Sequence, residues 1–118
     1  MALIASTGAI KPTPGVPLPA MPATGQTALQ NSYGYQQPVS AFVVRSLSTN
    51  SIGNKVYLLS NNSPADKTNY TNVLWYFETA NEAISFTSGP GTNVYELNQF
   101  YVDADSPGDG VMITYEIY

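Results

Sequence analysis

The chain has 118 residues, of which only 10% are charged, and its formal net charge is −4. Its positive side chains are Lys11, Arg45, Lys55 and Lys67, too few for the basic face that nucleic acids require or for attraction to anionic membranes. The absence of cysteine and histidine excludes disulfides, metal sites built on these residues, and nucleophilic catalysis by Ser-His-Asp or Cys-His arrangements. So little charge suits a protein that works inside an assembly better than an isolated monomer.

The first ten residues are apolar or small, but they do not match a targeting segment. The run is too short for a transmembrane helix and lacks the basic residues that open a signal peptide. We therefore expect the product to stay in the compartment where it is made, unless an assembly carries it out.

Residues 11–38 are rich in proline and carry no charged side chain after Lys11. Each proline fixes its φ angle and removes a backbone donor, so the five prolines between residues 12 and 22 exclude a helix and disfavour a central strand. The segment should be extended, in a polyproline-like conformation. The pattern predicts two parts, an extended N-terminal arm at residues 1–38 and a β body at residues 39–118.

This arm differs from most disordered tails, which are rich in charge, because it carries apolar side chains instead. We predict that it lies along a partner or a neighbouring copy. The alternatives are an arm wrapped on its own body and a disordered tail. The predicted contact residues are Pro12, Pro14, Val16, Pro17, Leu18, Pro19, Met21, Pro22 and Leu29.

Six segments of the body have the composition of β-strands, and turn formers separate them. These are residues 39–47, 55–60, 69–78, 84–87, 94–102 and 111–118. The first two are expected to form a hairpin, and the third carries apolar side chains on both faces, which predicts a strand covered on both sides. With no helical periodicity, the chain is predicted to be all-β, a small antiparallel β-sandwich or jelly roll with the N-terminal arm attached.

Three carboxylates fall close together after the fifth predicted strand. Asp103, Asp105 and Asp109 could gather the hard oxygen ligands that calcium prefers. The spacing matches the start of an EF-hand loop, but Pro107 stands where a ligand belongs and Thr114 where the bidentate glutamate belongs. We therefore favour a hairpin turn over a calcium site.

Nine tyrosines and Trp75 could form a sugar-binding surface, because aromatic rings stack on sugars. Their positions in predicted strands favour a core or interface role, since aromatic residues are also enriched in protein interfaces. Glu78 and Glu82 flank one predicted turn, but no spacing pairs them for glycosidase chemistry. We predict that the chain is not an enzyme and uses no cofactor.

In overall design the chain resembles bacteriophage capsid decoration (cement) proteins. The shared features are the proline-rich N-terminal segment, the small cysteine-free β body and the low charge. The resemblance implies a structural virion protein on the capsid surface, assembled in the host cytoplasm as a homo-oligomer, with a trimer favoured. It also implies the major capsid protein or other virion subunits as partners. Two other interpretations stay open: a tail, fibre or pilus subunit, and a carbohydrate-binding adhesion module.

Overall fold

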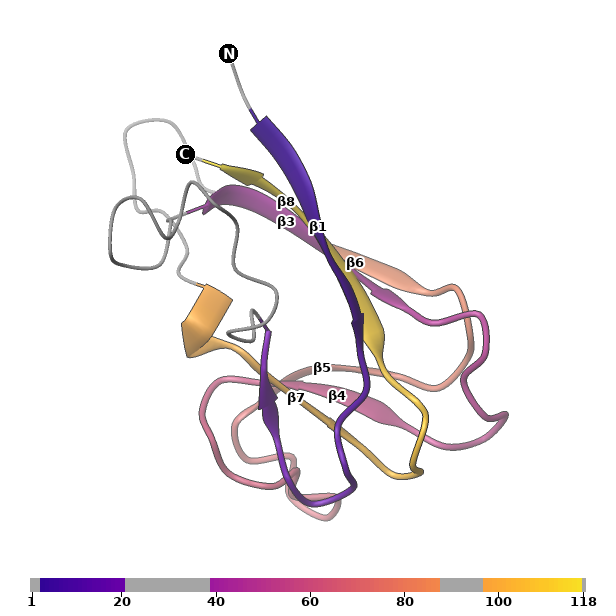
Figure 1. Cartoon of the computed structure of the whole chain (residues 1–118). Coiled ribbons are helices and arrows are strands. Elements are labelled where there is room, and N and C mark those ends of the chain that lie inside the picture. Colours follow the sequence, from indigo (N-terminus) through magenta and orange to yellow (C-terminus); the bar gives the residue numbers. More distant parts are fainter. Residues whose placement is uncertain (1–2, 21–38, 88–96, 118) are drawn as a thin grey trace.

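The computed structural model describes residues 3–20, 39–87 and 97–117, which form eight β-strands in two sheets (Figure 1). The first sheet has the order β1 (Leu3–Ile10), β8 (Val111–Ile117), β3 (Val39–Ser46) and β6 (Ala83–Thr87). The second has the order β2 (Leu18–Pro19), β7 (Tyr101–Ala104), β4 (Val56–Leu59) and β5 (Val73–Phe77). The prediction of an all-β sandwich is confirmed.

The strands pair as in one long hairpin that is folded into two sheets. The first strand pairs with the last, β2 with β7, β3 with β6 and β4 with β5, all antiparallel. Two further antiparallel pairs, β3 with β8 and β4 with β7, join these hairpin layers into the two sheets. This is the strand arrangement of an eight-stranded jelly roll.

Helical structure within the described residues is limited to a single 3-10 turn, η2 (Leu97–Gln99), just before β7. It falls within the predicted strand at residues 94–102, of which the structure describes residues 97–102, and strand β7 begins at Tyr101. No helix in the described part of the chain is long and apolar enough to cross a membrane.

Residues 3–20 are part of the sandwich, whereas the sequence predicted an extended arm at residues 1–38 that lies along a partner or a neighbouring copy. Strand β1 pairs with β8 from Leu3 to Ile10, and the Ile10 side chain is buried in the core. A bulge interrupts the pairing between Ser6 and Ala9, where the Ile113 amide donates to the Thr7 hydroxyl instead. Residues 3–20 therefore belong to the folded body, and residues 21–38 lie outside the described residues.

The prolines at residues 12–19 occupy positions where a missing backbone donor costs little. The chain turns between Thr13 and Val16, through Gly15 with a φ of 80°, as it crosses from the first sheet to the second. Pro19 lies in the edge strand β2 and pairs with Tyr101 of β7. Proline is tolerated in edge strands because one side of the strand makes no ladder hydrogen bonds.

The predicted hairpin between residues 39–47 and 55–60 is wrong, because these strands belong to different sheets. Strand β3 lies between β8 and β6, whereas β4 lies between β7 and β5. The loop after residue 104 is likewise no hairpin turn, since β7 and β8 are also in different sheets. In a jelly roll most connections cross from one sheet to the other, which local sequence patterns do not reveal.

The hydrophobic core fills the space between the sheets. Its aromatic centre is Phe42, which stacks on Phe86 with ring centroids 4.7 Å apart and meets Phe100 edge to face at 5.1 Å. The buried apolar residues around it come from both sheets: Ile10, Ala20, Val39, Val44, Val56, Leu58, Phe77, Leu97, Val102, Ala104, Val111, Ile113 and Tyr115.

The outer face of the second sheet is covered as well, and this affects the central strand β4. All four residues of β4 are buried, with Val56 and Leu58 in the core and Tyr57 and Leu59 on the opposite face. The segment at residues 60–72 covers this opposite face. A backbone hydrogen bond closes its base, where the Ser60 amide donates to the Asn72 carbonyl. The sequence predicted that the strand at residues 69–78, which contains β5, is covered on both sides. That prediction is wrong, because the strand covered on both sides is β4.

Candidate interaction site at the edge strand

Strand β5 lies at the edge of the second sheet and presents three consecutive apolar side chains to solvent. Leu74, Trp75 and Tyr76 are 44%, 43% and 37% exposed, while Phe77 next to them is buried in the core. Native sheets usually blunt their edges with charge or proline, because an apolar edge strand invites pairing with another chain. We call these three residues with Tyr70, which is also exposed, the aromatic edge.

A bulge at Leu74 interrupts the regular pairing of β5. In the pairing of β4 with β5, Leu58 lies opposite Trp75 and Leu59 opposite Val73, so Leu74 has no partner of its own. An extra residue bends the strand and increases its twist, which interrupts the strict alternation of buried and exposed faces. Of the apolar residues 73–77, only Phe77 is therefore fully buried.

Tyr70 and Lys55 extend the aromatic edge beyond the strand. The ring of Tyr70 stacks on that of Tyr76 with centroids 5.4 Å apart, and the Lys55 ammonium lies 4.7 Å from the Tyr76 centroid. Lys55 also donates to the Tyr70 hydroxyl at 2.9 Å. This hydrogen bond is the main reason why the pKa of Lys55 is raised, so the ammonium stays charged.

The backbone at Tyr70 is strained. Its φ is 55°, a left-handed conformation that bulky residues rarely adopt, and Asn72 just before β5 has a φ of 67°. Such strain is retained only where the surrounding structure enforces it, and it concentrates at functional positions. Here it places Tyr70 so that its ring stacks on Tyr76.

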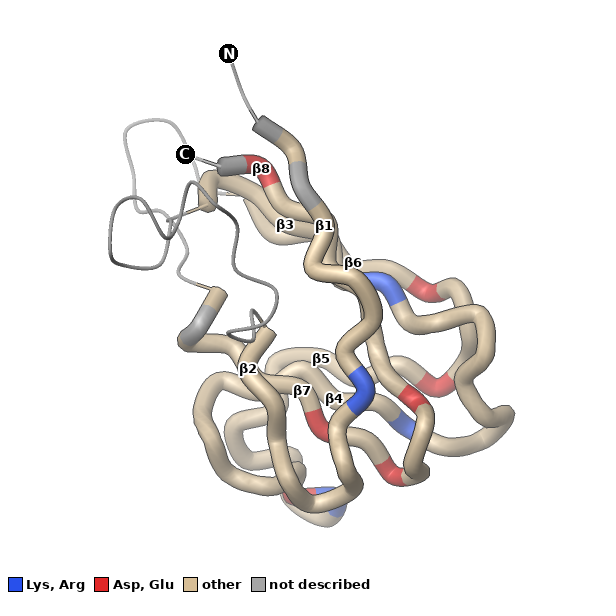
Figure 2. The backbone as a smooth tube through the Cα atoms, in the orientation of Figure 1, with Lys and Arg blue, Asp and Glu red and all other residues tan. Residues whose placement is uncertain are grey.

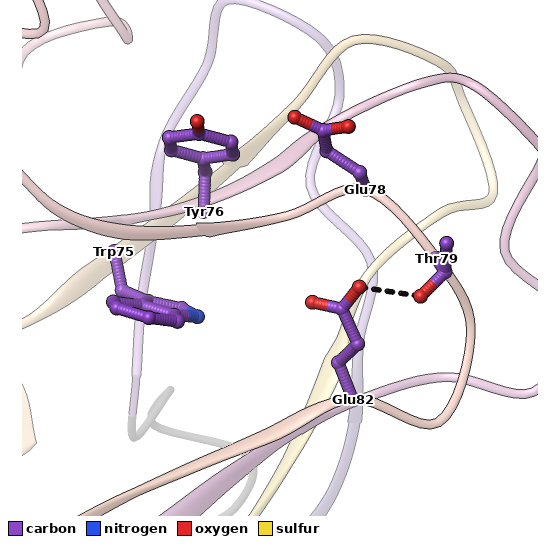
Figure 3. A pocket seen from close by; sticks show the side chains of 5 residues that line it. All are labelled: Trp75, Tyr76, Glu78, Thr79 and Glu82. Atoms are coloured by element: carbon purple, nitrogen blue, oxygen red, sulfur yellow. Dashed lines mark hydrogen bonds between the residues drawn. The ribbon is translucent and has the colours of Figure 1, made fainter.

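A hollow of about 340 Å³ opens beside the edge strand, lined by Trp75, Tyr76, Glu78, Thr79 and Glu82. Figure 3 shows the Trp75 and Glu82 side chains on one side of the strand and those of Tyr76 and Glu78 on the other. The Thr79 hydroxyl donates to the Glu82 carboxylate, which fixes that carboxylate near the indole. The hollow thus combines an aromatic wall with carboxylate acceptors.

Ser46 anchors the turn that carries these carboxylates. Its side chain is buried, accepts a hydrogen bond from the Glu82 amide at 2.9 Å and donates to the Thr79 carbonyl at 2.8 Å. The Ser46 backbone is also bonded to the Glu82 carbonyl and the Asn81 amide. The turn between the two edge strands β5 and β6 is therefore rigidly attached to β3, so the hollow is preformed.

The side chains that line the hollow suit the binding of a partially apolar ligand or partner. Two carboxylates and one threonine lie beside the two aromatic side chains in the lining of the hollow. An aromatic wall beside carboxylate acceptors can bury apolar surface and accept hydrogen bonds from amides, ammonium groups or hydroxyls.

The predicted arm contacts fall into three groups within the described residues and a fourth group outside them. Leu18 packs on the core and Pro12 is buried, so neither is free to bind a partner. Val16 is 57% exposed at the turn between the sheets, and it remains available. Pro14, Pro17 and Pro19 are half-buried in the same crossing. Met21, Pro22 and Leu29 lie outside the described residues.

The three aspartates considered for calcium serve separate structural roles instead. Asp103 accepts the amides of Gly15 at 3.0 Å and Ala65 at 2.9 Å, and it is buried. Asp109 accepts the Ser51 amide at 2.9 Å in a different loop. Within the described residues no group of three or more carboxylates is placed to hold a metal ion.

Asp105 is the third of these aspartates and bonds to three groups around β4. It accepts the Lys55 amide and the Tyr57 hydroxyl, and it forms an ion pair with Lys67 at 2.9 Å. Burial alone would raise the pKa of Asp105, but the hydrogen bonds from Lys67, Lys55 and Tyr57 outweigh it and lower the pKa below 3.8. The same burial, together with the Asp105 charge, raises the pKa of Tyr57.

The lowered pKa predicts how stability depends on pH. Asp105 contributes fully above its unfolded value of 3.8, and this contribution is lost as the pH falls through the lower folded value. We expect Asp105→Asn to lower the free energy of unfolding by about 1–3 kcal/mol at pH 7. The difference in free energy of unfolding between this variant and the unchanged protein, measured by urea titration, should become smaller as the pH falls from 5 to 2.5. A difference that stays constant over this range would contradict the assigned role.

Comparison with known proteins adds no relative. No protein-family model matches the chain, and neither the curated proteins nor the solved structures contain a match to it.

The residue types in the sequence indicated part of this site and not the rest. The sequence indicated Trp75 and the tyrosines as candidates for a core, an interface or a sugar-binding surface, and the structure places Trp75, Tyr76 and Tyr70 in the aromatic edge. The carboxylates Glu78 and Glu82 were noted only as neighbours of a turn. The contact of Lys55 with Tyr70 and Tyr76 was missed, because it depends on the path of the covering segment. A single basic residue near several tyrosines is too weak a signal to predict it.

Proposed function

We propose that this chain is a structural subunit of a larger assembly, and more specifically a virion protein that decorates a capsid lattice. The observation that carries the proposal is the aromatic edge, which includes three consecutive exposed apolar residues on a strand at the edge of its sheet. In a chain with 10% charged residues, such a surface is more stable when a partner covers it.

The jelly roll supports this proposal by analogy. Viral capsid domains and lectins both use this architecture, but a fold alone does not determine a function. The proposed partners are the major capsid protein or other virion subunits, with further copies of the chain in a homo-oligomer. Under this proposal the protein resides on the capsid surface after assembly in the host cytoplasm.

The proposed mechanism is edge docking. The outer side of β5 has backbone groups that meet no strand among the described residues, so an extended segment of a partner can add to the sheet there. Leu74 and Tyr76 would then be covered, and Trp75 would anchor the contact, since tryptophan and tyrosine carry much of the energy of protein interfaces. Met21, Pro22 and Leu29 remain proposed additional contacts.

Replacement of Trp75 by alanine tests the proposal. We expect Trp75→Ala to reduce binding to the assembly at least about tenfold, because truncating an aromatic anchor typically removes 2 kcal/mol or more. The side chain is 43% exposed, so the fold should remain intact. The measurement is the amount of tagged protein that co-sediments with particles purified from the cells that naturally make it.

Ile52 provides the matched control. It is 99% exposed in the loop between β3 and β4, so Ile52→Ala removes apolar surface without touching the aromatic edge. The proposal predicts unchanged co-sedimentation for this variant. If Trp75→Ala co-sediments as well as the unchanged protein, or if the protein is absent from all particles and filaments, the proposal is wrong.

The hollow favours one second candidate, a carbohydrate-binding adhesion module. Its indole wall can stack on a sugar ring while the Glu82 carboxylate accepts hydrogen bonds from sugar hydroxyls. The same variant separates the two functions. A glycan that binds the unchanged protein on an array and is lost in Trp75→Ala would favour the module, and an array without a hit would remove it.

A further inference from the structure

The outer face of the first sheet is open, unlike that of the second. The register places its outward-facing side chains in three rows across β1, β8, β3 and β6. The rows are Ile4, Glu116, Ala41 and Thr87; Ser6, Thr114, Val43 and Ser85; and Ala9, Met112, Arg45 and Ala83. All twelve side chains are exposed or half-buried, so no described segment covers this face.

The residues of this open face are small or apolar, with two exceptions. Glu116 lies in the first row and Arg45 in the third, and the other ten are uncharged. Figure 2 shows the same pattern, with long uncharged stretches along β1, β8 and β3. The ion pair that the structure shows between described residues joins Lys67 to Asp105, so neither charge of the open face is neutralised in this way.

The two charges are placed symmetrically about the centre of the face. The centre lies between Thr114 and Val43, which are paired in the middle row. Glu116 is two residues from Thr114 along β8, and Arg45 is two residues from Val43 along β3, in the opposite direction. A second copy can therefore be turned over, about an axis that runs across the strands in the plane of contact, so that each Arg45 lies opposite the other copy's Ala41 and beside its Glu116.

The surface relief agrees with this arrangement. A depression of about 160 Å³ lies at the Glu116 end, lined on the open face by Ile4, Ala41, Val43 and Thr114. Arginine combines a long apolar stem with a planar cation, so it can fill an apolar depression and reach a carboxylate at its side. Arg45, which is exposed, matches such a depression in a facing copy.

We infer that this open face binds a second copy of the chain, in a two-fold dimer held by two reciprocal Arg45–Glu116 ion pairs. In such an interface the same patch is used on both partners, so every contact occurs twice. The dimer leaves the aromatic edge on the other sheet free, and the inference does not depend on the proposed function. It differs from the trimer that the resemblance implies.

The size of the face sets the expected strength. Four strands about 4.8 Å apart and three rows of side chains give roughly 300 Å² on each copy. This is below the area of stable interfaces, so the dimer should be transient in dilute solution and have a dissociation constant in the micromolar range or weaker. Several copies held close together in an assembly would populate it fully.

Charge reversal tests the dimer. Sedimentation velocity at low ionic strength, from about 10 µM to 1 mM protein, should show a monomer–dimer equilibrium. Arg45→Glu and Glu116→Arg should each raise the dissociation constant at least about tenfold, because each places two like-charged pairs in the interface. An equimolar mixture of the two variants should form a heterodimer, since the charges at positions 45 and 116 are again opposite.

The mixture also separates an interface effect from a folding defect. Two misfolded variants would not restore association, whereas two folded variants with complementary faces would. Lys11→Glu makes the same charge change outside the open face and should leave the dimer unchanged. The inference would be overturned if the unchanged protein were only a monomer or a trimer. It would also be overturned if the single variants dimerised normally or if their mixture stayed monomeric. Trp75→Ala should leave this equilibrium unchanged.

Discussion

Gly110→Ala is expected to lower the free energy of unfolding by about 3 kcal/mol or more. A Cβ atom at position 110 would overlap the carbonyl oxygen of Ile10 and lie 2.8 Å from its carbonyl carbon and 3.1 Å from the Lys11 Cα. All three are backbone atoms, so no side-chain rotation relieves the clash. The end of β1 would have to move away from β8, and the buried Ile10 would move with it.

Urea unfolding of Gly110→Ala beside Gly53→Ala measures this effect. Gly53 has a φ of 83° and nothing within 4 Å of a new Cβ, so its replacement should cost only the 1–2 kcal/mol of a left-handed backbone. If Gly110→Ala lowered the free energy of unfolding no more than Gly53→Ala does, β1 would not pack beside Gly110. Residues 3–10 would then behave as the extended arm that the prolines suggested.

The body of the fold could be predicted because its strands have strong local signals. Val111, Ile113 and Tyr115 alternate with half-exposed residues in β8, as the period of two indicated. The β-branched run at residues 39–47 became β3, one residue shorter. These central strands are long, and their inner faces are apolar, so the sequence alone fixes which side faces the core.

The first two strands were missed because their stability comes from distant partners. Strand β1 contains small residues such as Ser6 and Gly8, which have low β propensity, and its partner is more than a hundred residues away. The prolines after it suggested an extended arm, but in the structure they shape a corner and an edge. A local pattern cannot distinguish an extended segment that docks on its own body from one that docks on a partner.

The site was predictable in its residue types and not in its geometry. Trp75 stood out as a candidate, but its exposure depends on the place of β5 at the edge of its sheet, where no described strand lies beyond it. The aspartates near residue 105 suggested a shared ligand because they are close in sequence. Long-range hydrogen bonds instead draw their oxygens to different loops. Within the described residues the three aspartates form no group that could hold a cation.

The Asp103 carboxylate should be the most costly of these to remove. It is 3% exposed, and it accepts the Gly15 amide on one oxygen and the Ala65 amide on the other. Hydrogen bonds to a charged group contribute about 1.5–3 kcal/mol each, and Asp103→Ala removes both. We expect a loss of about 3–5 kcal/mol in the free energy of unfolding by urea at pH 7.

Asp66→Ala isolates the effect of burial. Asp66 also accepts two amides, those of Thr68 and Asn69, each at 2.9 Å, but these bonds are exposed. Water can replace them, so this control should lose only about 1 kcal/mol. Equal losses in the two variants would show that the buried position of Asp103 adds nothing.

Asp103 also links the stability of the fold to the candidate site. Its bond to Ala65 holds the segment at residues 60–72 over the second sheet, and that segment carries Tyr70 of the aromatic edge. Once this bond is lost, the segment can lift, and the buried Tyr57 and Leu59 beneath it become accessible. Hydrogen exchange in folded Asp103→Ala should therefore rise first at residues 60–72. Unchanged protection there would mean that Asp105 and Lys67 hold the segment without Asp103.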